Sequence, residues 1–238
     1  MTDPIASSPF SGRMVAILIT IALFSFGAIM VLAGWAPELR DRNVAGSHPF
    51  STSALGYNGF VQLLEAQDYP VSISRLERTL TEDDWGLLVV TLPGWGASRA
   101  VEDLDTNRTT LLVLPKWVGM TDPTNRARQR DTRFIDASSV NDVLDTLGLE
   151  AEIGRIDIPD TIRTGAGRLA LRPDVKMQVI RGNNLEAIVE TPDGILLARD
   201  PATGMFILAD PDMINTFGLS RIENARFAMQ MIDLIRFD

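Results

Sequence analysis

The longest apolar run of the sequence lies near its N-terminus and predicts a membrane-spanning helix. Residues 14–34 form 21 consecutive positions without a charge, and at about 1.5 Å per residue such a helix crosses a hydrocarbon core of roughly 30 Å. Arg13 precedes the run and Trp35 follows it, as is typical of a membrane–water boundary. We therefore expect an N-terminal tail at residues 1–13, a transmembrane helix at 14–34 and a juxtamembrane linker at 35–50.

A cleaved signal peptide is the alternative interpretation of this run, because residues 31–33 (Val-Leu-Ala) satisfy the small-residue rule of a cleavage site. Signal peptides usually carry about 7 to 15 apolar residues, so the longer run favours a retained anchor. The few basic residues beside the span do not fix its orientation. Because a short tail with Arg13 next to the span resembles a signal anchor, we expect a single-pass cell-membrane protein with an extracytoplasmic domain.

The pattern after the linker predicts one α/β domain over residues 51–238. Apolar positions at i, i+3, i+4 and i+7 across residues 57–64 indicate an amphipathic helix, which Ser51 or Ser53 can cap by accepting a backbone N–H bond. A short extended run follows at residues 71–74.

Two segments, at residues 86–93 and 109–117, then contain continuous apolar runs that end at Pro93 and Pro115. This pattern is typical of strands that are buried on both faces of a parallel sheet. Together with the preceding helix, the two runs predict an α/β arrangement.

The middle of the chain predicts a short helix at residues 138–147 and then a β-rich elaboration, packed on the sheet edge, at about residues 151–209. Turn residues at 192–194 and 200–204 separate short alternating runs, so we expect two antiparallel hairpins there.

The last segment carries clear helix signals. Asp210 precedes a proline and is expected to cap a short helix that ends at Gly218. Ser220 and Glu223 match a capping box at the start of the final helix. The apolar stripe of that helix is expected to comprise Ile222, Ala225, Met229 and Ile232.

Composition narrows the chemistry that the domain can perform. The chain has no cysteine and one histidine, and its net charge is −9. Thiolate nucleophiles, disulfides, iron–sulfur clusters and cysteine zinc sites are therefore excluded, and a histidine-rich metal site cannot form within one chain. The acidic balance argues against binding of nucleic acid, which requires a basic surface.

Three segments resemble a known family: FSTSALGYNGFVQLLEAQDYPVSISR at residues 50–75, LLVLPKW at 111–117 and ILADPDMINTFGLSRIENARFAMQMI at 207–232. With the N-terminal anchor, they resemble the bacterial membrane-anchored family catalogued as domain of unknown function 4350. The resemblance implies a flavodoxin-like or class I glutamine-amidotransferase-like α/β domain. It also implies membrane or envelope protein partners, since members are often encoded near MoxR-type ATPases and von Willebrand factor A-like proteins. Members commonly carry a second span after the domain, so we expect a chain that is truncated or has lost that segment.

An amidotransferase requires a cysteine nucleophile at a strand-to-helix turn and a histidine base beside it. The corresponding segment, TLPGWGAS at residues 91–98, offers only Ser98, which favours loss of catalysis. Its glycines have the composition of a phosphate-binding turn, but Gly94 and Gly96 alone are weak evidence, and a plain loop is the preferred interpretation.

Other polar residues allow a ligand-binding role beside a structural one. Asp210 and Asp212 are a candidate carboxylate pair for acid–base chemistry or a divalent ion, although capping and the positive end of the helix explain both. Asn224 is expected to join the final helix to the preceding loop through its amide, and contact with a partner is the alternative. The candidate ligand-binding residues are Ser98, Asp210, Asp212 and Asn224.

Two further groups of residues lie between the predicted elements. Arg126, Arg128, Arg130 and Arg133 form a basic cluster, for which a solvated loop is preferred over binding of lipid headgroups. Trp95 and Trp117 are expected in the core, and lining of a groove at the sheet edge is the alternative.

The leading functional hypothesis is a noncatalytic recognition or assembly module of a bacterial envelope complex, without cofactor or metal. The alternative is a carboxylate-dependent hydrolase or a small-ligand-binding domain. An enzyme requires titratable groups that converge in a deep pocket, whereas a module requires an exposed apolar or charged patch.

Overall fold

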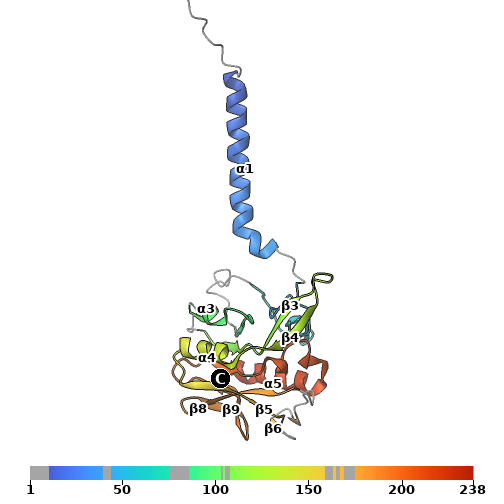
Figure 1. The fold of residues 1–238 in the computed structure, drawn as a ribbon, viewed down its shortest axis with the longest axis vertical. Coiled ribbons are helices and arrows are strands. Elements are labelled where there is room, and N and C mark those ends of the chain that lie inside the picture. The colour runs from blue at the N-terminus through green and yellow to red at the C-terminus, as the bar shows by residue number, and fades with distance from the viewer. Residues whose placement is uncertain are drawn as a thin grey trace, which may run out of the picture. The chain divides into compact units, whose positions relative to one another are not determined.

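The computed structural model describes residues 11–39, 44–74, 86–102, 104, 108–158, 163–164, 167–168 and 175–237. The chain divides into two compact units, Met1–Asp41 and Arg42–Asp238. The first unit contains helix α1 (Gly12–Leu39) (Figure 1). Within the described residues, the segment Gly12–Val31 is long and apolar enough to cross a membrane, and none of it is buried. The predicted apolar helix is therefore confirmed, although a signal sequence satisfies the same test.

The second unit is built on one mixed sheet, which has seven strands within the described residues. The order along the sheet is β1-β2-β11-β10-β8-β5, and β9 also pairs with β10. β1, β2 and β11 are parallel, whereas β10 pairs with its neighbours in the antiparallel sense, as do β5 and β8. The strand bounds are β1 Leu88–Thr91, β2 Thr110–Val113, β5 Ala151–Ile156, β8 Met177–Gly182, β9 Glu186–Thr191, β10 Gly194–Arg199 and β11 Phe206–Leu208.

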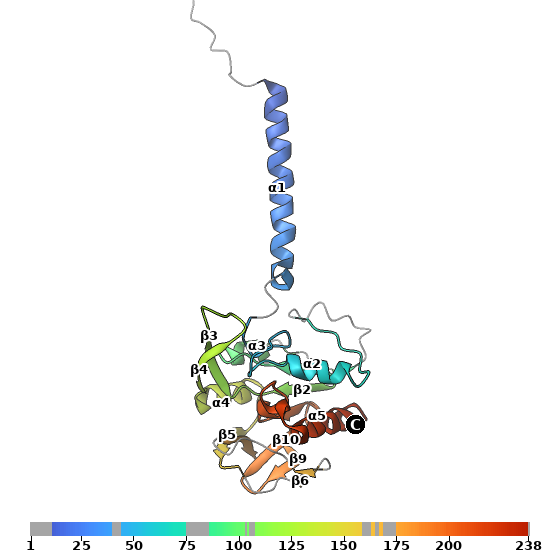
Figure 2. The ribbon, with the colours of Figure 1, turned by 90° about the vertical axis from the view of Figure 1, so that its right-hand side faces the viewer.

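Helices pack on both faces of this sheet (Figures 1 and 2). Alternate residues of a strand point to opposite faces, so Leu111 of β2 packs with α2 and α5, whereas Leu112 packs with α3 and α4. The chain therefore buries two apolar layers, one on each side of the sheet. The helix bounds are α2 Asn58–Glu65, α3 Ala97–Val101, α4 Ala137–Thr146 and α5 Ile222–Phe237.

The predicted α/β class is confirmed, but the sheet is less parallel than the apolar runs suggested. β2 is fully buried as expected, whereas β1 is half-buried. Both predicted hairpin turns join antiparallel strands, at β9–β10 and at β10–β11. Because β10 pairs directly with β11, the β-rich segment is hydrogen-bonded into the main sheet and extends it to the edge strand β5.

Smaller elements lie outside the main sheet. β3 (Trp117–Thr121) and β4 (Gln129–Phe134) form an antiparallel ribbon, and β6 (Arg163–Thr164) pairs with β7 (Gly167–Arg168). We call β3, β4 and the residues between them the arginine hairpin. The prediction of a solvated loop is wrong for Arg130 and Arg133, which lie in β4. β4 escaped prediction because its residues are mostly polar and exposed, without an apolar alternation.

The predicted caps of the first domain helix are wrong. Tyr57 occupies the N-cap of α2 and its side chain makes no cap bond, whereas the backbone N–H of Gly59 in the first turn donates to Thr216 Oγ1 at 3.4 Å. The Ser51 hydroxyl instead accepts the backbone N–H of Gly46 at 3.1 Å and of Ser53 at 3.3 Å. Both serines therefore order the preceding turn. Residues 71–74 have no regular secondary structure.

The C-terminal segment differs from its prediction in three details. The 3₁₀ helices η2 (Pro211–Met213) and η3 (Gly218–Ser220) precede α5, so Gly218 begins an element instead of ending one. The Ser220 hydroxyl donates to the Phe217 carbonyl at 2.7 Å, so it does not cap α5. The apolar stripe is shifted, because Ile222 is 59% exposed. The buried apolar residues of α5 are Phe227, Ala228, Met231, Ile232 and Ile235.

Candidate functional site

The sheet brings one lysine and two aspartates together at the carboxyl ends of adjacent parallel strands. Lys116 follows β2, and Asp210 follows β11. Parallel neighbours end at the same edge of a sheet, so the two side chains meet although 94 positions separate them in the sequence. Asp212 lies in η2, one turn further along the chain.

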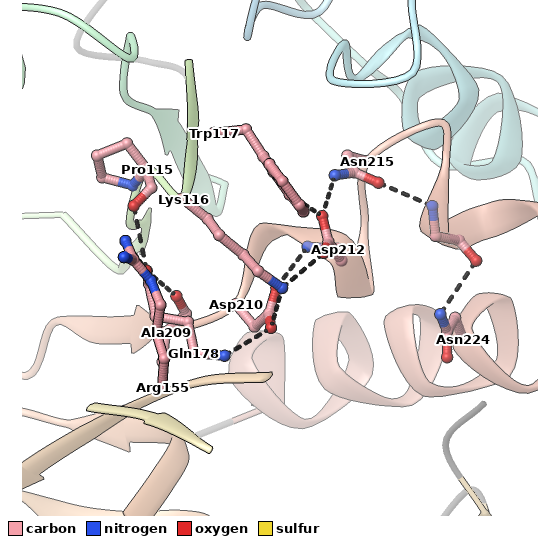
Figure 3. A network of polar contacts seen from close by, with 11 residues as sticks. Pro115, Lys116, Trp117, Arg155, Gln178, Ala209, Asp210, Asp212, Asn215 and Asn224 are labelled. Atoms are coloured by element: carbon pink, nitrogen blue, oxygen red, sulfur yellow. Dashed lines mark hydrogen bonds and ion pairs between the residues drawn. The ribbon is translucent and has the colours of Figure 1, made fainter. Parts of the chain in front are cut away.

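Lys116 lies between the two carboxylates (Figure 3). Its Nζ is 2.7 Å from Asp210 Oδ2 and 2.6 Å from Asp212 Oδ2, and all three side chains have no exposed surface. We call Lys116, Asp210 and Asp212 the buried triad. A buried charge is costly unless it is paired and hydrogen-bonded, so every polar atom of this group requires a partner.

Asp210 accepts hydrogen bonds from two further backbone donors. Its Oδ1 accepts the N–H of Asp212 at 3.0 Å, and its Oδ2 accepts the N–H of Gln178 at 2.8 Å. The first bond is the predicted helix cap, which is therefore confirmed for η2. The second bond connects the Asp210 carboxylate to strand β8, which contains Gln178.

Both carboxylate oxygens of Asp212 accept hydrogen bonds from side-chain donors. Besides Lys116, the carboxylate accepts Trp117 Nε1–H at 2.8 Å and Asn215 Nδ2–H at 2.7 Å, both at Oδ1. Trp117 in turn stacks on Phe134, with ring centroids 4.5 Å apart. The first residue of β3 therefore connects the buried triad to the arginine hairpin.

A second layer of amides surrounds the buried triad. Gln178 Nε2 donates to the carbonyls of Pro115 at 3.1 Å and of Ala209 at 2.8 Å. These are the residues directly before Lys116 and Asp210, so one buried glutamine fixes the ends of β2 and β11 relative to β8.

Burial and charge act on the pKa values of this group in different directions. Burial lowers the pKa of Lys116, but the two carboxylates together raise it above its ordinary value. Burial and the neighbouring Asp212 raise the pKa of Asp210 against the opposing effect of Lys116. Burial and both carboxylates raise the pKa of Tyr57, so its hydroxyl stays protonated.

The geometry leaves little room for a ligand beside the buried triad. The adjoining cavity has a volume of about 10 Å³ and is lined by Tyr57, Lys116, Trp117 and Asn215, among others, which is about the space of one water. The Lys116 ammonium occupies the position between the carboxylates that a cation would take. Within the described ranges, no group of three or more His, Cys, Asp or Glu side chains is placed to hold a metal.

The other candidate residues fall into two cases. Asn224 is connected to the site, because its Nδ2 donates to Gly218 O at 3.0 Å and Gly218 N donates to Asn215 Oδ1 at 2.8 Å. The predicted amide link between the last helix and the preceding loop is thus confirmed. Gly218 allows this close packing, since a Cβ there would lie 1.5 Å from the Asp212 carbonyl oxygen.

Ser98 lies apart from this network in α3, where it is half-buried. Gly94, which precedes it, packs against β3: a Cβ on Gly94 would lie 2.8 Å from the Trp117 carbonyl oxygen. A packing requirement therefore explains that glycine without a phosphate. Trp95 is 69% exposed, so its predicted place in the core is wrong, whereas Trp117 is half-buried.

The sequence interpretation missed Lys116, Gln178 and Asn215. The position of Lys116, directly after a buried apolar run, was a usable signal. A lysine is almost never fully buried unless it is paired. A buried lysine at this position therefore predicts an acidic partner at the end of a neighbouring strand, and Asp210 is that partner. Gln178 carried no comparable signal, since its role depends on the pairing of β8.

No protein-family model matches this chain, and no curated protein matches it at a significant level. The resemblance to the membrane-anchored family of unknown function therefore stays an expectation.

Proposed function

We propose that this chain is a single-pass membrane protein whose domain is a noncatalytic recognition or assembly module of a bacterial envelope complex. The observation that carries the proposal is the saturation of the buried triad. Each carboxylate oxygen of Asp210 and Asp212 accepts at least one hydrogen bond from a protein donor. These contacts support a structural role for Asp210 and Asp212. The alternative, a carboxylate-dependent hydrolase, would need the same two residues for catalysis.

A hydrolase requires a carboxylate that reaches a substrate or a water in a pocket. Ligand pockets of this kind have volumes of roughly 300–1,000 Å³, far above the cavity of about 10 Å³ beside Lys116. The closed geometry weighs against hydrolysis at this edge of the sheet.

The surface that best suits recognition is the arginine hairpin. Arg128, Arg130 and Arg133 are exposed there, and the side chain of Met120, paired with Arg130 across the ribbon, is 62% exposed. Arginine and methionine are enriched at protein interfaces, whereas lysine and glutamate are depleted. We propose that a membrane or envelope protein with an acidic surface binds here.

Helix α1 supplies the anchor in this proposal. Its apolar segment suits a span through the lipid bilayer, and the domain that follows would then lie outside the cytoplasm. Retention is checked by N-terminal sequencing of the mature protein: a start near Met1 supports the anchor, and a start at Gly34 overturns it.

Site-specific photocrosslinking in intact cells tests recognition. A photoreactive residue replaces Met120 on the arginine hairpin of the full-length chain, and Gln67, which is also exposed, provides the matched control position. We expect a discrete adduct from position 120, absent from position 67, that disappears when Arg128 and Arg130 are both changed to Glu. Equal labelling from both positions, or an adduct that survives the charge reversal, would overturn the proposed surface.

A further inference from the structure

The buried triad also contains the groups that an intramolecular condensation of an amine with a carboxyl group requires. An amine, a carboxyl group that can receive it and a second carboxylate lie within hydrogen-bond distance of one another, without exposed surface. Three features bear on whether amine and carboxyl can join: proton transfer, activation of the carboxyl group and exclusion of water.

We propose that Lys116 and Asp210 condense to an intramolecular isopeptide bond, with Asp212 as the group that carries the proton. Nζ of Lys116 is 2.7 Å from Oδ2 of Asp210 and 2.6 Å from Oδ2 of Asp212. The bond would covalently join the ends of the adjacent strands β2 and β11.

The step balances without an oxidant, a reductant or a cofactor. One proton passes from the Lys116 ammonium to Asp210, and the free amine attacks Cγ of the protonated acid, so that a Cγ–Nζ bond forms. Asp212 takes a second proton from the bonded nitrogen. One Cγ–O bond then breaks, and the leaving hydroxyl takes the proton from Asp212 and departs as water. One ammonium and one carboxylate become a neutral amide, while the Asp212 carboxylate is regenerated.

Backbone donors are in place to activate the carboxyl group of Asp210. The N–H groups of Asp212 and Gln178 donate to its two oxygens at 3.0 and 2.8 Å. Donors fixed in this way stabilise the negative charge that develops on oxygen in a tetrahedral intermediate. The raised pKa of Asp210 supports the same assignment, because only the protonated acid is the electrophile.

Asp212 is held as the proton carrier by donors that do not react. Trp117 Nε1–H and Asn215 Nδ2–H both bond to Oδ1, which leaves Oδ2 directed at Lys116. After condensation the same Oδ2 can accept the N–H of the new amide, so the product leaves no donor of the buried triad without a partner.

Exclusion of bulk water favours condensation over hydrolysis. Lys116 and both aspartates are fully buried, and the adjoining cavity of about 10 Å³ matches the one water that the step releases. Tyr57 and Trp117 are among the residues that line this cavity.

Peptide mapping of the unaltered full-length chain tests the proposal. The chain is extracted from membranes, denatured and digested with trypsin, which cannot cleave after a condensed Lys116. We expect one branched peptide that joins residues 109–126 to residues 200–221, at their summed mass less one water. Separate peptides 109–116 and 200–221 at full mass, with no branched species, would overturn the proposal.

Two variants control for other routes to the loss of water. Lys116→Arg keeps the positive charge but cannot form the amide, so the branched peptide should vanish and the intact chain should gain the mass of one water relative to the value expected from the substitution alone. Dehydration that persists in Lys116→Arg would indicate a succinimide, for which Asp193 before Gly194 is a candidate, and would count against the bond.

Asp212→Asn separates proton transfer from proximity. Lys116 and Asp210 both remain in this variant, so a bond that needs only proximity would still form. We expect loss of at least most of the branched peptide, with circular dichroism reporting that the chain is folded. Full condensation in folded Asp212→Asn would overturn the role of Asp212, and the wild-type map would still decide on the bond itself.

Discussion

Lys116 and the arginines of the arginine hairpin are close in sequence but differ in what surrounds their charges. Lys116 has two carboxylate partners within 2.7 Å and no exposed surface. Arg130 lies 3.8 Å from Asp131, and both of these side chains are more than half exposed. The comparison separates two uses of charge. A buried charge is fixed by its partners, so that loss of one partner destabilises the domain, whereas an exposed charge contributes little to stability and stays available for another molecule.

Trp117 and Trp95 repeat this contrast for aromatic side chains. Trp117 stacks on Phe134 and donates to Asp212, while Trp95 is largely exposed. Trp95 lies in a loop beside the start of β3, where Trp117 is located, since Gly94 packs against the Trp117 backbone. The cationic side chains and the tryptophans therefore each have a more buried and a more exposed representative, which provide pairs for mutagenesis.

The largest effect is expected from removal of the buried cation. Lys116→Met leaves two buried carboxylates without their ammonium, and loss of one partner of a buried ion pair costs about 3–5 kcal/mol. Lys176→Met is the control, because Lys176 forms an exposed ion pair with Asp157 at 3.1 Å and such pairs contribute about 0–1 kcal/mol. Denaturant unfolding of the detergent-extracted chain, followed by circular dichroism, measures both. Equal losses would contradict a stabilising role of the buried triad.

A smaller loss is expected for Asp212→Asn. Both oxygens of Asp212 face N–H donors, so the amide NH₂ group of asparagine must face a donor in either orientation. A buried donor without an acceptor costs about 1–3 kcal/mol. The free energy of unfolding should fall by this amount, and a neutral result would show that Lys116 needs only one carboxylate. Asp193→Asn in the exposed turn between β9 and β10 is the control for the substitution itself.

Trp117→Phe tests one hydrogen bond of the same network. The variant keeps an aromatic ring to stack on Phe134 but removes the Nε1–H donor to Asp212. A hydrogen bond to a charged group contributes about 1.5–3 kcal/mol, and Asn215 still donates to the same oxygen, so we expect a loss near the lower bound, about 1.5 kcal/mol. Trp95→Phe, at an exposed position, should change the free energy of unfolding by less than about 0.5 kcal/mol.

The parts of this structure that the sequence predicted are those determined by local patterns. The apolar helix, the strands at β1 and β2, the two hairpin turns and the Asp210 cap each follow from residues close together in the chain. The buried triad could be predicted only in part, because the partner of Asp210 lies 94 positions away. Its recognition needs the pairing of β2 with β11, which two apolar runs do not specify. The buried face of α5 was predicted wrongly for a similar reason. Two faces of that helix carry apolar residues, and tertiary packing buries the face with Phe227.

The smallest effect on stability is expected in the arginine hairpin, where it should accompany the largest effect on binding. Exposed charges can be exchanged within about 0.5 kcal/mol, so the double variant Arg128→Ser and Arg130→Ser should unfold like the wild type. If an acidic partner binds here, the same variant should lose most of the adduct from position 120, and raised salt should weaken that adduct in the wild type, because screening acts most strongly on exposed charges. Lys116→Arg provides the opposite case, since it alters the buried triad and leaves the arginine hairpin unchanged. A destabilised arginine variant that retains full crosslinking would reverse the roles assigned to the two regions, because the exposed arginines would then support the fold and not the recognition of a partner.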